Sequence, residues 1–113
     1  MIVKKNSIKN KKIVIIGGAG FIGHNLSLAL KKLNANISII DNLKVNNLYS
    51  ISKKNLNYPF PKLTKKIINE RISLLNKNKI AIYKIDAKNH KALHFQLKKI
   101  KPNVIIHLAA VSH

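Results

Sequence analysis

All 4 glycines of the chain lie in one short stretch, Gly17-Gly18-Ala19-Gly20-Phe21-Ile22-Gly23. The spacing fits both G-x-x-G-x-x-G and G-x-G-x-x-G. Glycines permit a tight turn and let backbone N–H groups approach a phosphate closely. No Ser, Thr, Asp or Asn stands ready to cap the helix expected after the turn, so its N–H groups and positive dipole end remain available to an anion. The stretch predicts a pyrophosphate site; the alternative is a turn that only packs helix against strand.

Asp41 follows these glycines at close to the spacing of about 20 residues expected for a ribose-binding acid. A carboxylate there accepts hydrogen bonds from both hydroxyls of an adenosine ribose and repels a 2′-phosphate. It therefore favours NAD over NADP, a preference that Lys44 nearby would soften. The alternative is that Asp41 serves only as a local turn or cap residue.

Elements that could position these residues are visible in the hydrophobic pattern. The run Ile13-Val14-Ile15-Ile16 is continuously apolar, as in a strand covered on both faces, and it ends at Gly17. The period then becomes helical from Phe21 to Leu33, and the apolar face expected for this helix is Ile22, Leu26, Ala29, Leu30 and Leu33. A second apolar run, Ile37 to Ile40, ends at Asp41. This pattern predicts a β-α-β unit with a right-handed crossover.

The rest of the chain continues the alternation. Residues 80–83 predict a third strand, 89–99 an amphipathic helix and 104–106 a fourth strand, whereas 42–79 form a long connection with helical spacing in its second half. The fold class is therefore α/β, the N-terminal portion of a Rossmann-type parallel sheet with four strands and about three helices. We expect the sheet order 3-2-1-4, with the first two helical segments on one face and the third on the other.

The predicted domain organisation is a basic tail, residues 1–11, followed by an incomplete NAD-binding domain, residues 12–113. The alternation stops after the fourth strand, so no helix is expected to cover that strand. Ile105 or its neighbours would then face water, and the strand would present an uncovered apolar edge.

Taken together, these motifs resemble the extended short-chain dehydrogenase/reductase family, particularly its nucleotide-sugar epimerases and dehydratases. The resemblance rests on GGAGFIG at Gly17–Gly23, Asp41-Asn42-Leu43, Asp86 after the third strand, and VIIHLAA at Val104–Ala110. One departure is Ile16, which stands where the family usually has threonine. The resemblance implies NAD as cofactor and a nucleotide-sugar as substrate of the full-length parent protein.

The same resemblance assigns the cofactor contacts. Glycines of the turn, with Phe21 and Ile22, would line the pyrophosphate, and Asp86 with Ala87 would meet the adenine. The segment after the fourth strand would pass beside the ribose and nicotinamide. The full set of expected cofactor-binding residues is Gly17, Gly20, Phe21, Ile22, Gly23, Asp41, Asn42, Asp86, Ala87, Leu108, Ala109 and Ala110.

No catalytic residue is assigned. The family's Tyr-x-x-x-Lys should lie beyond the fourth strand, and the two local matches, Tyr49 with Lys53 and Tyr58 with Lys62, precede the third strand and are interpreted as coincidence. No metal site is predicted either, because the chain has no cysteine and His90 and His94 lack partner ligands.

The charge is strongly basic, with 22 Lys+Arg against 3 Asp+Glu and a formal net charge of +19. Arg71 is the only arginine, whereas a surface selected for base or phosphate recognition usually recruits arginine. We interpret the lysines mainly as drift in an AT-rich genome, so specific nucleic-acid binding is not expected. A non-catalytic nucleotide- or RNA-binding module remains the alternative function.

The remaining expectations concern location and assembly. No apolar run reaches the roughly 20 residues that cross a bilayer, and no secretory signal is visible. We therefore expect a cytoplasmic protein without membrane contact, whose full-length parent forms a homodimer.

Overall fold

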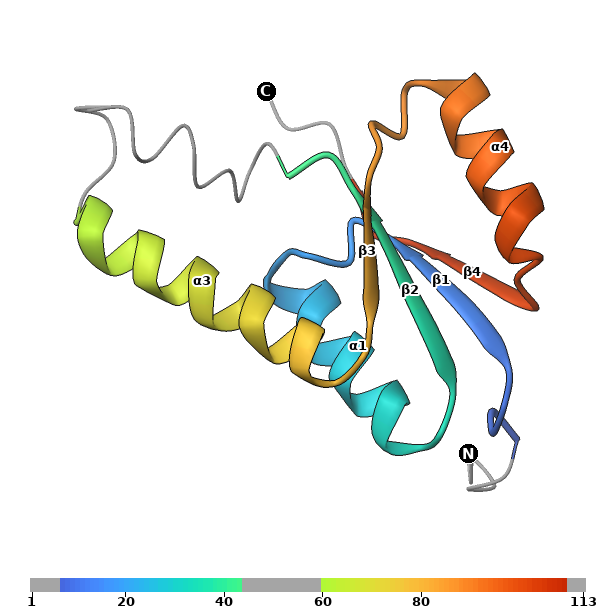
Figure 1. The fold of residues 1–113 in the computed structure, drawn as a ribbon, viewed down its shortest axis with the longest axis horizontal. Helices are drawn as coiled ribbons and strands as arrows, with labels where there is room; N and C mark the ends of the chain where they lie inside the picture. The colour runs from blue at the N-terminus through green and yellow to red at the C-terminus, as the bar shows by residue number, and fades with distance from the viewer. Residues whose placement is uncertain (1–6, 44–59, 110–113) are drawn as a thin grey trace.

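The computed structural model describes residues 7–43 and 60–109 (Figure 1). Four parallel strands form one sheet in the order β3-β2-β1-β4, as the sequence predicts. The elements follow the chain as β1 (Lys12–Ile16), α1 (Phe21–Lys32), β2 (Asn36–Asp41), α3 (Pro61–Lys77), β3 (Ala81–Lys84), α4 (His90–Ile100) and β4 (Val104–His107).

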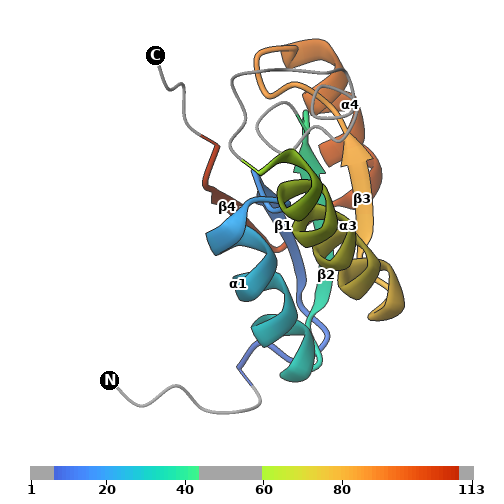
Figure 2. The ribbon, with the colours of Figure 1, turned by 90° about the vertical axis from the view of Figure 1, so that its left-hand side faces the viewer.

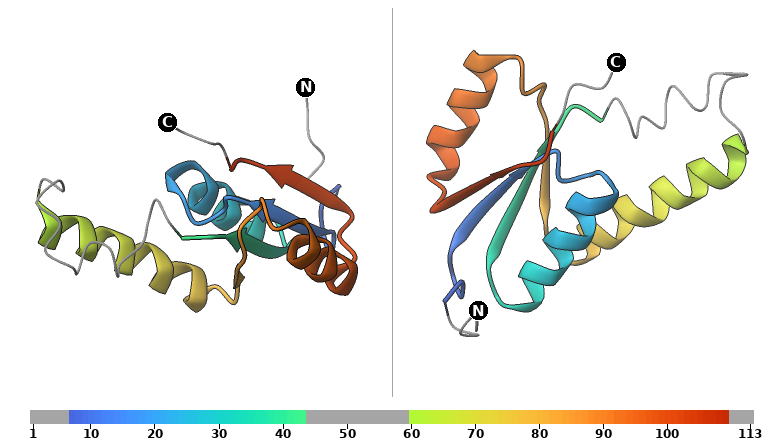
Figure 3. Two further views of the ribbon diagram at one scale, coloured as in Figure 1. Left: turned by 90° about the horizontal axis from the view of Figure 1, so that it is seen from above. Right: turned by 180° about the vertical axis from the view of Figure 1, so that it is seen from behind.

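Helices cover both faces of this sheet (Figures 2 and 3). α1 and α3 lie together on one face, and α4 lies alone on the opposite face. This is the arrangement that right-handed crossovers impose on the strand order, and it confirms the prediction. We call the side under α1 and α3 the first face and the side under α4 the second face.

β1 is central, and its apolar run is buried on both sides. Ile13 and Ile15 point into the first face, where they join a buried cluster with Leu75 of α3. Val14 and Ile16 point into the second face beneath α4. Because alternate side chains of a strand face opposite ways, only a continuous apolar run satisfies both layers.

α1 packs differently from the expectation that Ile22 and Leu33 belong to its buried face. Ile22 is 69% exposed and Leu33 is 38% exposed, whereas the buried residues of the helix are Gly23 and Ser27. The Ser27 hydroxyl donates to the Gly23 carbonyl at 2.7 Å. Small residues let the helix approach the sheet closely, and Leu26 and Leu30 of the predicted face pack against the first-face cluster.

The long connection between β2 and β3 contains α3, which begins at Pro61. Proline suits the first helical turn because it sacrifices no intrahelical hydrogen bond there. The helix buries Ile68 and Leu75. The predicted helical spacing in the second half of the connection is thus confirmed, whereas Tyr49, Lys53 and Tyr58 lie outside the described residues.

At the sheet edge, β4 exposes apolar side chains. Val104 is 42% exposed and Ile105 is 49% exposed, in agreement with the prediction for Ile105. At the other end of the chain, the predicted basic tail includes described residues that contact the fold. Ile8 packs against the first-face cluster, and the Asn10 amide donates to the Asn34 carbonyl at 2.9 Å.

Candidate functional site

The glycine-rich turn joins the carboxyl end of β1 to the start of α1. At three of its glycines, a side chain would clash with neighbouring atoms of the chain. A Cβ on Gly17 would lie 2.6 Å from the Ala109 nitrogen, and one on Gly23 would lie 2.6 Å from the Gly17 oxygen. A Cβ on Gly18 would lie 2.7 Å from the Ile39 side chain. These three glycines are explained by packing of the turn against β2, β4 and α1.

Gly20 is different, because none of the described residues lies close enough to exclude a side chain at this position. Its backbone is extended, with φ −75° and ψ −179°, a conformation open to any residue. Among residues 7–43 and 60–109, a Cβ there would meet only the Gly17 oxygen, at an ordinary 3.7 Å. The space beside Gly20 is therefore left open at the start of α1. A group approaching from outside, such as a pyrophosphate, would use that space, so this observation fits the predicted ligand.

The N-terminus of α1 has the electrostatic character that an anion needs. No side chain of the described residues caps it, and its first turn contains no acidic residue. Phe21 and Ile22 lie in this first turn with side chains 72% and 69% exposed. α4 contrasts with it, because the Asn89 side chain accepts from the Ala92 amide at 3.2 Å and caps that helix. The start of α1 thus presents backbone donors and a positive dipole end.

Asp41, at the end of β2, is bound to the same turn. One carboxylate oxygen accepts from the Ala19 amide at 3.0 Å, and the other accepts from the Leu43 amide at 2.8 Å. The bond from Leu43 gives Asp41 the local turn role that the sequence left open as an alternative. The bond from Ala19 is a long-range contact that the spacing alone did not predict. Each carboxylate oxygen has two acceptor sites, so these bonds leave capacity for ribose hydroxyls.

The end of β3 brings Asp86 to the same edge of the sheet. The Ile85 amide donates to the Asp41 carbonyl at 3.1 Å, which fixes the two segments side by side. The Asp86 carboxylate accepts from the Lys88 amide at 2.9 Å, and Asp86, Ala87 and Asn42 are all half-buried. Two of the 3 acids in the chain thus lie at the carboxyl ends of neighbouring strands, Asp41 as the last residue of β2 and Asp86 just after β3.

The segment after β4 reaches the turn from the other side. The Leu108 and Ala109 amides both donate to the Ile16 carbonyl, at 2.7 and 3.0 Å. Ala109 also packs directly against Gly17, since a Cβ on Gly17 would clash with the Ala109 backbone. The structure therefore brings together the expected site residues that it describes, whereas Ala110 lies outside the described residues.

One contact to the turn was missed by the sequence analysis. The Arg71 guanidinium, on α3, donates to the Ala19 carbonyl at 3.2 Å. Burial lowers the pKa of Arg71 from its ordinary value. Its being the only arginine was visible in the sequence, but nothing in the pattern linked it to a turn 52 positions away.

Comparison with known proteins places this geometry in a wider group. The profile of the NAD dependent epimerase/dehydratase family matches residues 13–113. The bifunctional protein GAL10 of Pachysolen tannophilus is 30% identical over 88% of this chain and 12% of its own length. The dTDP-D-glucose 4,6-dehydratase of Dictyostelium discoideum is 31% identical over 96% of this chain and 21% of its own length.

Solved structures show the same fold. The epimerase Mth375 of Methanothermobacter thermautotrophicus, 28% identical, superimposes with a TM-score of 0.59 over 95% of this chain and 25% of its own. The UDP-glucose 4-epimerase of Thermus thermophilus, solved with NAD, is 19% identical, with a TM-score of 0.57 over 89% of this chain and 24% of its own. The chain spans a quarter or less of the length of each of these proteins.

Proposed function

The chain belongs to the NAD-dependent epimerase/dehydratase family, and we propose that its glycine turn, Asp41 and neighbouring strand ends bind the adenosine and pyrophosphate part of NAD. The whole protein would act on a nucleotide-linked sugar, as an epimerase (an isomerase) or a dehydratase (a lyase). We further propose that this enzyme is cytoplasmic and that it forms a homodimer. Among the described residues, no helix is long and apolar enough to cross a membrane.

Gly20 is the observation that carries this proposal. Packing accounts for Gly17, Gly18 and Gly23, but the described residues give Gly20 no steric reason to be glycine. A ligand that occupies the space beside Gly20 supplies that reason. The uncapped start of α1 lies at the same place, so the open volume and the positive helix end favour the same kind of ligand, a diphosphate.

Each group around the turn would have a separate role. Backbone N–H groups at the start of α1 would hold the pyrophosphate, and Asp41 would accept hydrogen bonds from the adenosine ribose. Asp86 and Ala87 would border the adenine, and Leu108 and Ala109 would face the ribose and nicotinamide side. NAD, when bound, supplies a hydride acceptor. The chain's own contribution is to bind and orient, and no catalytic residue is assigned to it.

The first test fills the space beside Gly20. Gly20→Val places a branched side chain where the fold is open, so we expect the far-ultraviolet circular dichroism spectrum to be unchanged and NAD binding to be lost. Ala29→Val is a matched control, because Ala29 is exposed on the same helix. NAD affinity is measured by NMR titration of the 15N-labelled chain. Retention of wild-type affinity by Gly20→Val would contradict the proposed site.

The second test concerns cofactor choice at Asp41. The wild-type chain should prefer NAD to NADP, since the carboxylate repels a 2′-phosphate. Asp41→Asn should narrow this gap by removing the charge, and Asp41→Ala should narrow it further while also releasing the Ala19 amide. Equal NAD and NADP affinities in the wild type would refute the assignment of Asp41 to the ribose.

A further inference from the structure

Arg71 connects α3 to the glycine turn. Its Nη1 atom donates to the Ala19 carbonyl at 3.2 Å, and the Asp41 carboxylate accepts from the amide of the same residue at 3.0 Å. Ala19 itself is only 1% exposed. Both backbone polar groups of this buried alanine are thus held by charged side chains from two other elements.

The geometry of the peptide bond extends this contact to Gly20. The Ala19 carbonyl and the Gly20 N–H belong to one peptide unit, and the described residues contain no cis peptide bond. In a trans unit the carbonyl and the N–H point in opposite directions. By holding the Ala19 carbonyl toward α3, Arg71 therefore turns the Gly20 N–H away from α3. Gly20 is the residue beside which the fold leaves open space.

The choice of arginine at this position supports a specific role. Every other cation among the 22 Lys+Arg is lysine, so the composition strongly favours lysine wherever charge alone suffices. The Arg71 Nε atom is buried, and burial lowers the pKa of this guanidinium. Arginine remains charged under such conditions and offers donors in a fixed planar fork, which lysine lacks.

We propose that Arg71 is the positioning residue of the diphosphate site: it orients the Ala19–Gly20 peptide and places a positive charge behind the turn. This inference rests on the proposed function. The ligand concerned is the diphosphate of a dinucleotide, and the role of Arg71 is exerted through Ala19. α3, which lies between the two ends of the long β2–β3 connection, thereby contributes to cofactor affinity.

The wild-type chain provides a direct test. Because Arg71 is the only arginine, its Nε–H gives a single NMR cross-peak that needs no assignment by elimination. Titration of the 15N-labelled full chain with ADP should shift this peak together with the Gly20 amide. Titration with adenosine, which lacks the diphosphate, should leave the Arg71 peak in place. A Gly20 shift with ADP but no Arg71 shift would overturn the proposal.

Variants give the second arm of the test. Arg71→Met should lower ADP affinity about tenfold or more, the value of a charge-assisted contact, while changing adenosine affinity less than about twofold. Arg71→Lys should recover only a small part of the ADP affinity that Arg71→Met loses. A purely structural role would instead lower the melting temperature and weaken both ligands equally, and that result would overturn the proposal.

The control addresses the high positive charge of the chain. Lys66→Met removes one charge from an open, lysine-lined groove on the same helix, and it should change ADP affinity less than about twofold. An effect as large as that of Arg71→Met would reject a specific role. If Arg71→Met does not fold, the wild-type titration decides. If neither ADP nor NAD shifts any residue of the turn, the proposed function fails, and this inference fails with it.

Discussion

The two faces of the sheet are packed to different degrees. Under α1 and α3, the first face contains a large buried cluster, Ile13, Ile15, Ala19, Ala35, Ile37, Ile39, Leu75 and Ile80. Under α4, the second face buries only Val14, Ile16 and Ile40 among the described residues, and α4 itself has no fully buried residue. The glycine turn belongs to the first face, since Ala19 is part of its cluster.

This difference in packing explains why the turn lies on the first face. Backbone donors bind an anion well only when their directions are fixed, and close packing fixes them. On the first face, Ile39 fills the space beside Gly18, and Asp41 and Arg71 hold Ala19. The second face contributes the strand ends near the site, but its helix packs only through half-buried side chains.

The largest expected effect comes from emptying the core of the first face. Ile39→Ala should lower the free energy of unfolding by about 3–4 kcal/mol, because Ile39 is fully buried and its removal leaves a cavity. Leu97→Ala, on the half-buried side of α4, should cost about 1–2 kcal/mol. Urea denaturation followed by circular dichroism measures both. Equal losses would contradict the comparison between the faces.

The next effect separates two glycines of the same turn. Gly23→Ala should destabilise the chain by about 1–3 kcal/mol, because the new Cβ would meet the Gly17 and Gly18 backbone at 2.6 Å. Gly20→Ala should cost less than about 1 kcal/mol, because it adds no steric clash and only replaces glycine as the N-cap of α1. Thermal melts of the two variants compare them directly. A larger loss at Gly20 would show that this glycine has a packing role after all.

A smaller effect is expected at the two helix starts. Asn89→Ala removes the side-chain cap of α4 and should cost about 1 kcal/mol, without changing NAD affinity. Asn89→Asp should restore stability, since aspartate also caps a helix and favours its positive end. Chemical denaturation and NAD titration are run on each variant. Because the Asn89 amide donates to the Asp86 carbonyl at 2.9 Å, a change in NAD affinity would mean that the start of α4 also positions Asp86.

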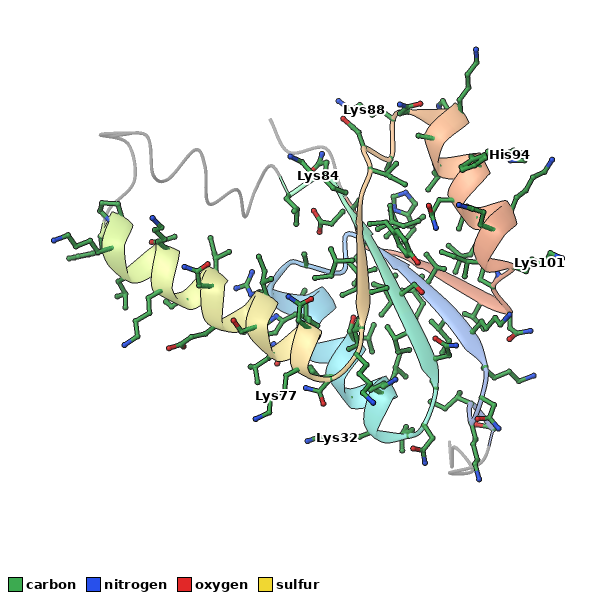
Figure 4. The ribbon with its side chains drawn as sticks, viewed as in Figure 1. Lys32, Lys77, Lys84, Lys88, His94 and Lys101 are labelled. Atoms are coloured by element: carbon green, nitrogen blue, oxygen red, sulfur yellow. The ribbon has the colours of Figure 1, made fainter. Side chains whose placement is uncertain are left out.

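The smallest effect is expected from the lysines, which are spread over both faces. Figure 4 shows Lys32 and Lys77 near the ends of first-face helices, and Lys88 and Lys101 flanking α4 on the other side. Such a spread predicts RNA binding that is weak, indifferent to sequence and steeply reduced by salt. Fluorescence titration of two unrelated single-stranded RNAs at rising salt measures this. Sequence-selective binding at physiological ionic strength would favour the alternative, an RNA-binding module.

Much of the fold could be predicted because the hydrophobic pattern is local and periodic. The run from Ile13 to Ile16 favours a strand buried on both sides, and the change of period at Phe21 indicates a helix. Parallel order and handedness then follow from chain connectivity. The pattern was less informative for α1, where Ile22 is apolar but exposed, because periodicity alone does not say which neighbours will cover a helix face.

For the candidate site, the sequence is sufficient to predict which residues lie at the ends of the strands. The glycine stretch, Asp41 and Asp86 follow directly from where the apolar runs stop, and each run must stop at the same edge of a parallel sheet. The residue types then predict a site that binds an anion and a diol. These conclusions need no knowledge of distant contacts.

The contacts that hold the glycine turn in place are visible only in the tertiary structure. It separated Gly20 from the three glycines that packing requires, and it brought the Asp41 carboxylate and the Arg71 guanidinium to the two sides of Ala19. No local pattern specifies such contacts, because residues far apart in sequence meet only after the strands pair and the helices pack. The direction of a backbone N–H depends on those contacts, so the shape of the site is a property of the assembled fold.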